Sequence, residues 1–205
     1  MEFCKKKQKK VEPGSPNRSE EGDAWIYACI KRHTYFFVAF SVGKWTQETC
    51  RMMMEKLYER TELPLPDNKI DIFTDGNSDY EHVLSELYAE TCMNYGQLIK
   101  IRDGGKVVDK EKRIIYGNPE PNEIETTDIE NFNGICRERG GRLVRKTKCF
   151  SKYKRRLECA LHLFQFYWDF INEFKRGTSP AIMEGLTEHV WSWHEFFYFP
   201  LTIPD

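Results

Sequence analysis

Strand-like and helix-like apolar segments alternate along this chain, and this order limits the folds that it can adopt. A partial strand lies before residue 5, and further strand-like segments cover residues 24–32, 35–42, 69–74 and 97–101. A helix begins at Thr46, where Thr-Gln-Glu-Thr offers an N-cap oxygen, and a second helical segment covers residues 80–88. Leading strands followed by alternation predict an α/β fold with a mixed sheet flanked by helices.

The second half of the chain adds two helices and an aromatic tail. Residues 102–126 are polar and predict irregular structure with one short strand at 113–116, and a helix follows from Thr127 or Asp128. The clearest helix covers residues 153–174, where apolar residues recur at three- and four-residue spacing: Leu157, Leu161, Phe164, Trp168 and Ile171. We expect one domain over residues 1–175 and a C-terminal tail over residues 176–205.

Positive charge is concentrated in one segment of an otherwise neutral chain. Ten Lys or Arg residues and one acid, Glu138, lie between Arg137 and Arg156, while the formal net charge of the chain is -1. Such a segment predicts a polyanionic partner, DNA or RNA; the alternative is a solvated helix face, on which the two signs are normally mixed. The residues expected to contact phosphates are Arg137, Arg139, Arg142, Arg145, Lys146, Lys148 and Lys152.

Two acids are candidates for metal-dependent chemistry. Asp75 follows an apolar strand and precedes Gly76, so its carboxylate is expected at the edge of the sheet. Glu130 lies in the first turns of a later helix and could reach the same crevice. Mg²⁺ takes oxygen ligands, and one or two carboxylates per ion suffice for phosphoryl transfer. The alternatives are a turn-forming Asp and an acid that stabilises the helix dipole.

The same residues carry a resemblance to a known family. Glu130-Asn131-Phe132-Asn133, followed by Arg137, by residues 142–147 and by residues 149–152, resembles the C-terminal signature of the insertion-sequence-one family of transposases. Thr74-Asp75-Gly76 resembles the strand-end motif that holds the second Asp of that family. The resemblance covers about residues 3–172.

This resemblance implies an RNase H-like fold and a transposase catalytic domain that cleaves DNA 3′ ends and transfers strands. It implies Mg²⁺ or Mn²⁺ as the cofactor, transposon ends and target DNA as partners, and Asp75 and Glu130 as catalytic metal ligands. The family's first Asp is absent, because aligning residues 3–7 with its first-strand motif places that Asp before Met1 or on Met1 itself.

We therefore expect a domain that is incomplete at its N-terminus and inactive as given. Asp23 and Asp79 are the first candidates to replace the absent acid. Two alternatives stay open: a non-catalytic DNA-binding remnant of a transposase, and an RNase H-like nuclease with another function.

The remaining features point to a cytoplasmic, nucleoid-associated protein, with homo-oligomerisation left open. There is no run of 18 apolar residues, so no transmembrane helix is expected. Seven cysteines at irregular spacing favour reduced thiols over a disulfide framework. His189 and His194 have near-ligand spacing, but packing against the neighbouring aromatic residues is the favoured interpretation.

Overall fold

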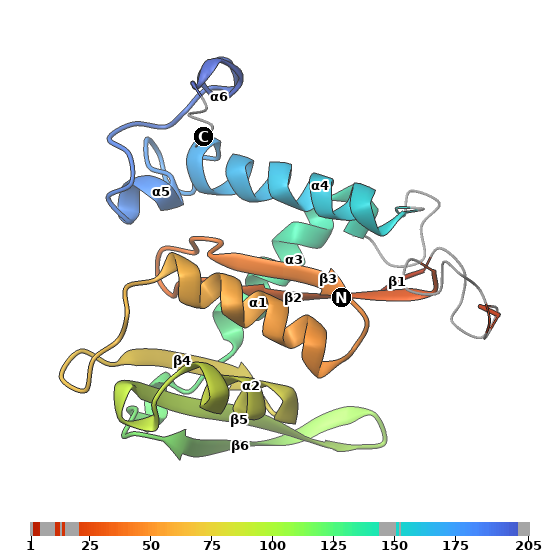
Figure 1. The fold of residues 1–205 in the computed structure, drawn as a ribbon, viewed down its shortest axis with the longest axis vertical. Coiled ribbons are helices and arrows are strands. Elements are labelled where there is room, and N and C mark those ends of the chain that lie inside the picture. The colour runs from red at the N-terminus through yellow and green to blue at the C-terminus, as the bar shows by residue number, and fades with distance from the viewer. Residues whose placement is uncertain are drawn as a thin grey trace.

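The computed structural model describes residues 2–4, 11, 12, 14, 21–143, 151 and 153–200. The described strands form two three-stranded sheets (Figure 1). In the first sheet, which is antiparallel, the order is β1 (Glu2–Cys4), β2 (Asp23–Cys29) and β3 (Ala39–Gly43). In the second sheet, which is mixed, the order is β4 (Ile70–Asp75), β5 (Met93–Asp103) and β6 (Lys106–Tyr116). The expected α/β class with a mixed sheet is confirmed.

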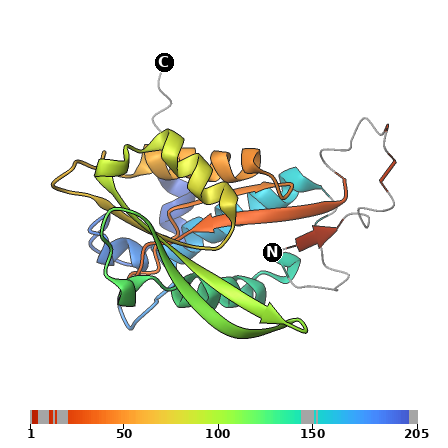
Figure 2. The same ribbon diagram turned by 90° about the horizontal axis from the view of Figure 1, so that it is seen from below.

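Helices cover both faces of the strands (Figures 1 and 2). The longer helices are α1 (Gln47–Arg60), α2 (Ser78–Leu87), α3 (Thr127–Arg139) and α4 (Lys154–Phe166). The short helices are η2 (Glu90–Cys92), η3 (Pro121–Glu123), η4 (Gly141–Leu143), the π-helical turn η5 (Tyr167–Ile171), α5 (Pro180–Met183) and α6 (Trp193–Tyr198).

The core consists of two apolar clusters. One lies between α1, α2 and the strands and includes Met53, Leu57, Val83, Ile72 and Tyr95. The other joins β3 to α3 and α4 and includes Phe40, Val42, Phe132, Leu161 and Trp168. Because β2 and β3 contribute to both clusters, this sheet is covered on both faces, which explains its near-continuous apolar sequence.

Several sequence predictions are confirmed. Thr46 is the N-cap of α1, and its hydroxyl oxygen accepts a hydrogen bond from the backbone N–H of Thr49 at 3.4 Å. Helices α2 and α3 begin close to the expected positions, and the strand before Gly76 ends at Asp75. Strands β1 and β2 pair as the two arms of an antiparallel hairpin.

The predicted strand over residues 35–42 is wrong in its first half. His33 and Tyr35 have positive φ values of 67° and 57°, so the chain turns sharply there, and β3 begins only at Ala39. The backbone N–H of Phe37 donates to the carboxylate of Asp169 at 2.8 Å, and the carbonyl of Val38 accepts from Arg60 at 2.7 Å. Side chains from distant helices thus satisfy the backbone groups that a strand would use.

The prediction of irregular structure is wrong for residues 102–112, because β5 and β6 form a long hairpin; the short strand predicted at 113–116 is the end of β6. Asp103 pairs with Lys106, and the two residues between them, Gly104 and Gly105, have positive φ values of 54° and 82°. Positive φ at both positions is the requirement of a type I′ turn. Residues 106–114 are exposed, so this strand carries no alternating apolar face that a sequence pattern could detect.

The long helix predicted over residues 153–174 is divided. α4 ends at Phe166, and the chain continues as the π-helical turn η5, which buries both Trp168 and Asp169. The described part of the tail packs back on this turn, since Trp191 and Phe196 both lie against Phe166.

Two further expectations concern cysteines and membranes. The cysteines whose side chains the structure describes, residues 29, 50, 92, 136 and 159, are all free thiols, as expected. Within the described part of the chain, no helix has the length and apolar character that crossing a bilayer requires.

Candidate functional site

Asp75 stands where β4 meets α2. Its carboxylate is exposed, and one oxygen accepts the backbone N–H of Asn77 at 3.2 Å. The side chain of Asn77 in turn accepts the N–H of Asp79 at 3.1 Å and caps α2. Asp75 therefore forms the turn that its position before Gly76 predicts. No described residue donates a hydrogen bond to its second carboxylate oxygen, which can accept one from a ligand.

The strand register assigns Asp75 to the face of the second sheet that also holds Gly96 and Lys100. Asp75 pairs with Leu98 on β5, and paired residues of parallel strands project to the same face. Gly96 lies two residues earlier on β5, and the space that a side chain would take there is filled by Ile124, in the segment that leads into α3. Lys100 lies two residues after Leu98 and therefore projects to the same face. Ideal strand geometry puts the Cβ atoms of Lys100 and Asp75 about 8 Å apart.

Glu130 lies in the first turn of α3 and is tied to the second sheet. Its Oε1 accepts a hydrogen bond from the Thr126 hydroxyl at 2.5 Å and forms an ion pair with the Lys100 ammonium. Partial burial raises the pKa of Glu130, but the hydrogen bonds from Lys100 and Thr126 outweigh that effect and hold the pKa below its ordinary value. The carboxylate is therefore ionised at neutral pH.

The register thus assigns Asp75 and Lys100 to one face of the second sheet, and Glu130 of α3 forms an ion pair with Lys100. The immediate partners of the two acids differ, because the charge of Asp75 acts on Tyr80 and Tyr95 while Glu130 interacts with Lys100 and Thr126. Among the described residues, no group of three or more His, Cys, Asp or Glu side chains is placed to hold a metal ion. A Mg²⁺ ion at Glu130 would also have to displace the Lys100 ammonium, so these residues do not form a complete metal site.

Three of the predicted phosphate-binding residues are described. Arg139 donates to the side-chain oxygen of Asn172 and lies over the Trp168 ring at 5.4 Å, so it joins α3 to the π-helical turn. Arg142 donates to the Ser151 hydroxyl at 3.3 Å. The Nε atom of Arg137 is buried and has no hydrogen-bond partner among the described residues. The other predicted residues, Arg145, Lys146, Lys148 and Lys152, lie outside the described residues.

The two acids that could replace the absent carboxylate occupy different places. Asp23 begins β2 and pairs with Cys4, at the end of the first hairpin. Asp79 lies in the first turn of α2, where its carboxylate accepts a hydrogen bond from the Tyr27 hydroxyl at 3.4 Å. Since Asp79 and Asp75 both contact Asn77, Asp79 is the nearer of the two candidates to Asp75.

His189 and His194 pack against aromatic rings, as expected. His189 stacks on Trp191, with ring centroids 6.4 Å apart, and contacts Glu195 at 2.7 Å. His194 stacks on Tyr198 at 4.4 Å.

The sequence interpretation missed Lys100 and Thr126, the two residues that hold Glu130. Thr126 precedes Glu130 by one helical turn at the start of a helix, a spacing that could have identified it. Lys100 is thirty residues away and is found only from the strand register. Comparison of the chain with family models, with curated proteins and with solved structures finds no match.

Proposed function

We propose that this chain is a DNA-binding domain of the transposase type, with an RNase H-like arrangement of strands. The observation that supports the proposal is the ion pair of Glu130 with Lys100, a residue that the register assigns to the same face of the second sheet as Asp75. The basic segment continues from α3, the helix that carries Glu130. The resemblance of Thr74-Asp75-Gly76 and of the segment from Glu130 to Lys152 to one transposase family supports the same proposal.

The strand directions support an RNase H-like arrangement. β1 and β3 are both antiparallel to β2, and β4 runs in the same direction as β3 (Figure 1). β1 pairs only with Asp23–Trp25, so residues 26–29 of β2 have no strand partner on the β1 side among the described residues. The edge of β4 that faces away from β5 also has no strand partner among the described residues. A strand between β2 and β4 would join the two sheets into one mixed sheet, with Asp75 near its centre.

The basic segment supplies the proposed DNA contacts. Arg137 and Arg142 lie at the end of α3 and just beyond it, and α4 begins with Lys154, Arg155 and Arg156. Lys and Arg side chains that neutralise phosphates provide affinity without sequence preference. Arg139 is the exception among the described residues, because its guanidinium already binds Asn172 and Trp168; we assign it to the support of α3.

The proposed activity of the described residues is DNA binding. Among them no group of three acids is placed to hold a metal ion, and Lys100 pairs with Glu130. No metal-dependent step is therefore assigned to the described residues. A protein of this kind would act in the cytoplasm at the bacterial nucleoid, bound to DNA and able to assemble with an intact transposase.

The test of DNA binding is a salt titration with a short DNA duplex, measured by fluorescence anisotropy. The logarithm of the binding constant should fall with the logarithm of salt concentration, with a slope of about -0.9 for each neutralised phosphate. Replacing Arg142, Arg145 and Lys146 together by Ala should reduce that slope by up to about 3.

The matched control replaces three exposed lysines elsewhere, Lys69, Lys106 and Lys175, by Ala, which removes the same net charge. This control should keep nearly the full slope. Equal slopes for both triple variants would mean that net charge alone attracts DNA, and the basic segment would then be a solvated surface.

The test of chemistry compares the chain as given with a variant in which β1 is lengthened at its N-terminus by a strand that carries an Asp. With Mg²⁺ or Mn²⁺, only the lengthened variant should cut DNA. Cleavage by the chain as given that is lost in Asp75→Asn would show that another acid completes the site, and Asp79→Asn would be examined first. Preferential cutting of an RNA–DNA hybrid would favour a nuclease over a transposase.

A further inference from the structure

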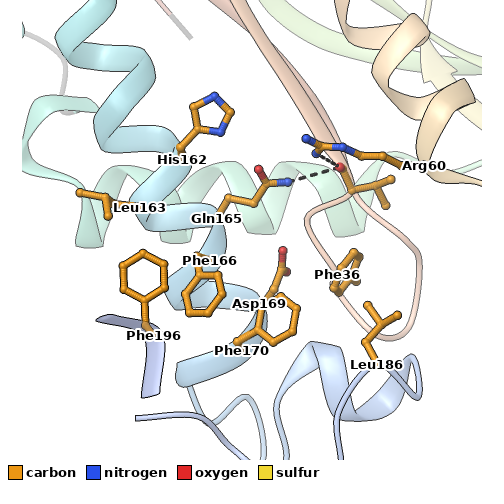
Figure 3. Close-up of a pocket in the computed structure, with 11 residues that line it drawn as sticks. Phe36, Arg60, His162, Leu163, Gln165, Phe166, Asp169, Phe170, Leu186 and Phe196 are labelled. Atoms are coloured by element: carbon orange, nitrogen blue, oxygen red, sulfur yellow. Dashed lines mark hydrogen bonds between the residues drawn. The ribbon is translucent and has the colours of Figure 1, made fainter. Parts of the chain in front are cut away.

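A cavity of about 580 Å³ opens beside the first sheet, and it is lined by none of the residues of the candidate site (Figure 3). It opens between α4, the π-helical turn η5, the loop before β3 and the C-terminal helix α6. This volume falls within the range of small-molecule sites, which are largely apolar with a few convergent polar groups. π-helical turns are rare and often occur at functional sites.

A buried acid forms the polar centre of this cavity. Asp169 is only 2% exposed, and its Oδ1 accepts the backbone N–H of Phe37 at 2.8 Å. No described residue donates a hydrogen bond to Oδ2, and the side chain points into the cavity (Figure 3). Burial raises the pKa of Asp169 to about 8, so the carboxyl group is protonated at neutral pH and can donate a hydrogen bond.

Aromatic rings line the walls. Phe166 stacks on Phe170 with ring centroids 4.8 Å apart and an interplanar angle of 11°, and Phe196 lies 4.3 Å from Phe166. Phe36 approaches from the loop before β3, on the other side of Asp169 (Figure 3). Rings on both sides of a polar centre suit a flat ligand that stacks while one edge meets the acid.

The polar groups at the rim oppose a charged ligand. Arg60 and Gln165 both donate to the carbonyl of Val38, at 2.7 and 3.3 Å, so the guanidinium is already committed to the backbone. Burial and the nearby charges of Lys56 and Arg60 lower the pKa of His162, which is neutral at pH 7. A cation would meet the charge of Arg60, and an anion would meet the negative faces of the phenyl rings.

A hydrocarbon fits less well than a ring with polar atoms, because it would leave the Asp169 proton without an acceptor in a buried place. We propose that this cavity binds a neutral bicyclic nitrogen heterocycle of the purine type, stacked on the phenylalanine rings that line it, with a ring nitrogen accepting a hydrogen bond from Asp169. Polar substituents on the ring would lie toward His162 at the open side. The inference is independent of DNA binding by the basic segment.

The first experiment titrates the full chain with adenosine, with ribose and naphthalene as comparison ligands, by calorimetry or by NMR shifts. Adenosine should bind saturably and more tightly than naphthalene, and ribose should not bind. Asp169→Leu should weaken adenosine binding by roughly tenfold or more. Absence of saturable adenosine binding, or equal binding of naphthalene and adenosine, would overturn the proposal.

A matched pair of substitutions tests the place of binding. Phe196 lines the cavity, whereas its neighbour Phe197 is 72% exposed and does not. Phe196→Leu should weaken adenosine binding, and Phe197→Leu should leave it unchanged. The same effect from both substitutions would place the ligand elsewhere.

The pH dependence tests the hydrogen bond itself and needs no variant that risks unfolding. The groups that face Asp169 are the Phe37 N–H, Arg60 on α1, Glu184 after α5 and His162 on α4. Adenosine affinity of the unmodified chain should fall by about tenfold between pH 7 and pH 9, as the protonated fraction of Asp169 falls. Asp169→Asn keeps a neutral donor and should show no such fall; an equal fall in both proteins would exclude the hydrogen bond.

Discussion

Replacement of the buried Asp169 by Asn should remove most of the pH dependence of folding stability between pH 4 and pH 8. Asn has the same shape, and its carbonyl oxygen can accept the Phe37 N–H that now binds the carboxylate at 2.8 Å. The substitution therefore removes an ionisable proton and leaves the packing and the hydrogen bond in place.

The size of the effect follows from the pKa of the folded state. Burial raises the pKa of Asp169 from 3.8 to about 8, against the opposing effects of the Phe37 N–H and Arg60. Between these values the folded chain keeps a proton that the unfolded chain has lost, so stability is highest at low pH and decreases as pH rises. The decrease is about 3 kcal/mol between pH 5 and pH 7, and it ends near pH 8.

The assay is urea denaturation at pH 5 and pH 7, followed by tryptophan fluorescence. The unmodified chain should lose about 3 kcal/mol more stability over this interval than Asp169→Asn does. Other groups with shifted pKa values, such as Glu130 and Glu195, are common to both proteins and cancel in the difference. Asp71→Asn, at an exposed position, is the matched control and should behave like the unmodified chain.

Equal pH dependence in the unmodified chain and in Asp169→Asn would refute this reasoning. It would mean that the folded protein holds Asp169 ionised at neutral pH. The carboxylate would then need a positive partner, and Arg60 would be the first residue to examine.

Two further predictions concern the candidate site. Gly96→Ala should destabilise the fold by about 1–3 kcal/mol in the same denaturation assay, because the added methyl group would lie 2.7 Å from Ile124. The control is Gly134→Ala, at an open position inside α3, which should stabilise the fold by about 0.5–1 kcal/mol. Lys100→Met should raise the pKa of Glu130, as followed by NMR, since it removes the hydrogen bond and the charge that lower it. An unchanged pKa in that variant would separate Glu130 from β5 and from the face of the sheet to which Asp75 belongs.

The local part of the fold could be predicted because it depends on neighbouring residues. The cap at Thr46 and the end of β4 at Asp75 follow from the chemistry of residues within one turn or one strand. Only residues 97–101 and 113–116 of the β5–β6 hairpin were predicted as strand, because the exposed β6 strand carries no apolar alternation. Residues 35–38 were misassigned for the opposite reason, since their apolar side chains resemble those of a buried strand.

The candidate site was predicted only in part. Asp75 and Glu130 were singled out from their places at element ends, but the face that Asp75 shares with Lys100 depends on the parallel register of β4 and β5. The partner of Glu130, Lys100, is thirty residues away, and no local pattern encodes that distance. The sequence therefore pointed to the two acids, and only the tertiary structure shows that the Lys100 ammonium pairs with Glu130.

By itself, the sequence determined the α/β class, the caps, the strand-end acid and the position of the basic segment, because propensity, capping and charge act over a few residues. Tertiary structure alone decided that Phe37 and Val38 leave the strand ladder and that Asp169 becomes the centre of an aromatic cavity. These features arise from contacts between residues more than a hundred positions apart in the sequence, such as the 2.8 Å hydrogen bond from the Phe37 N–H to Asp169. Burial of Asp169 raises its pKa, and the composition of the chain cannot reveal that burial.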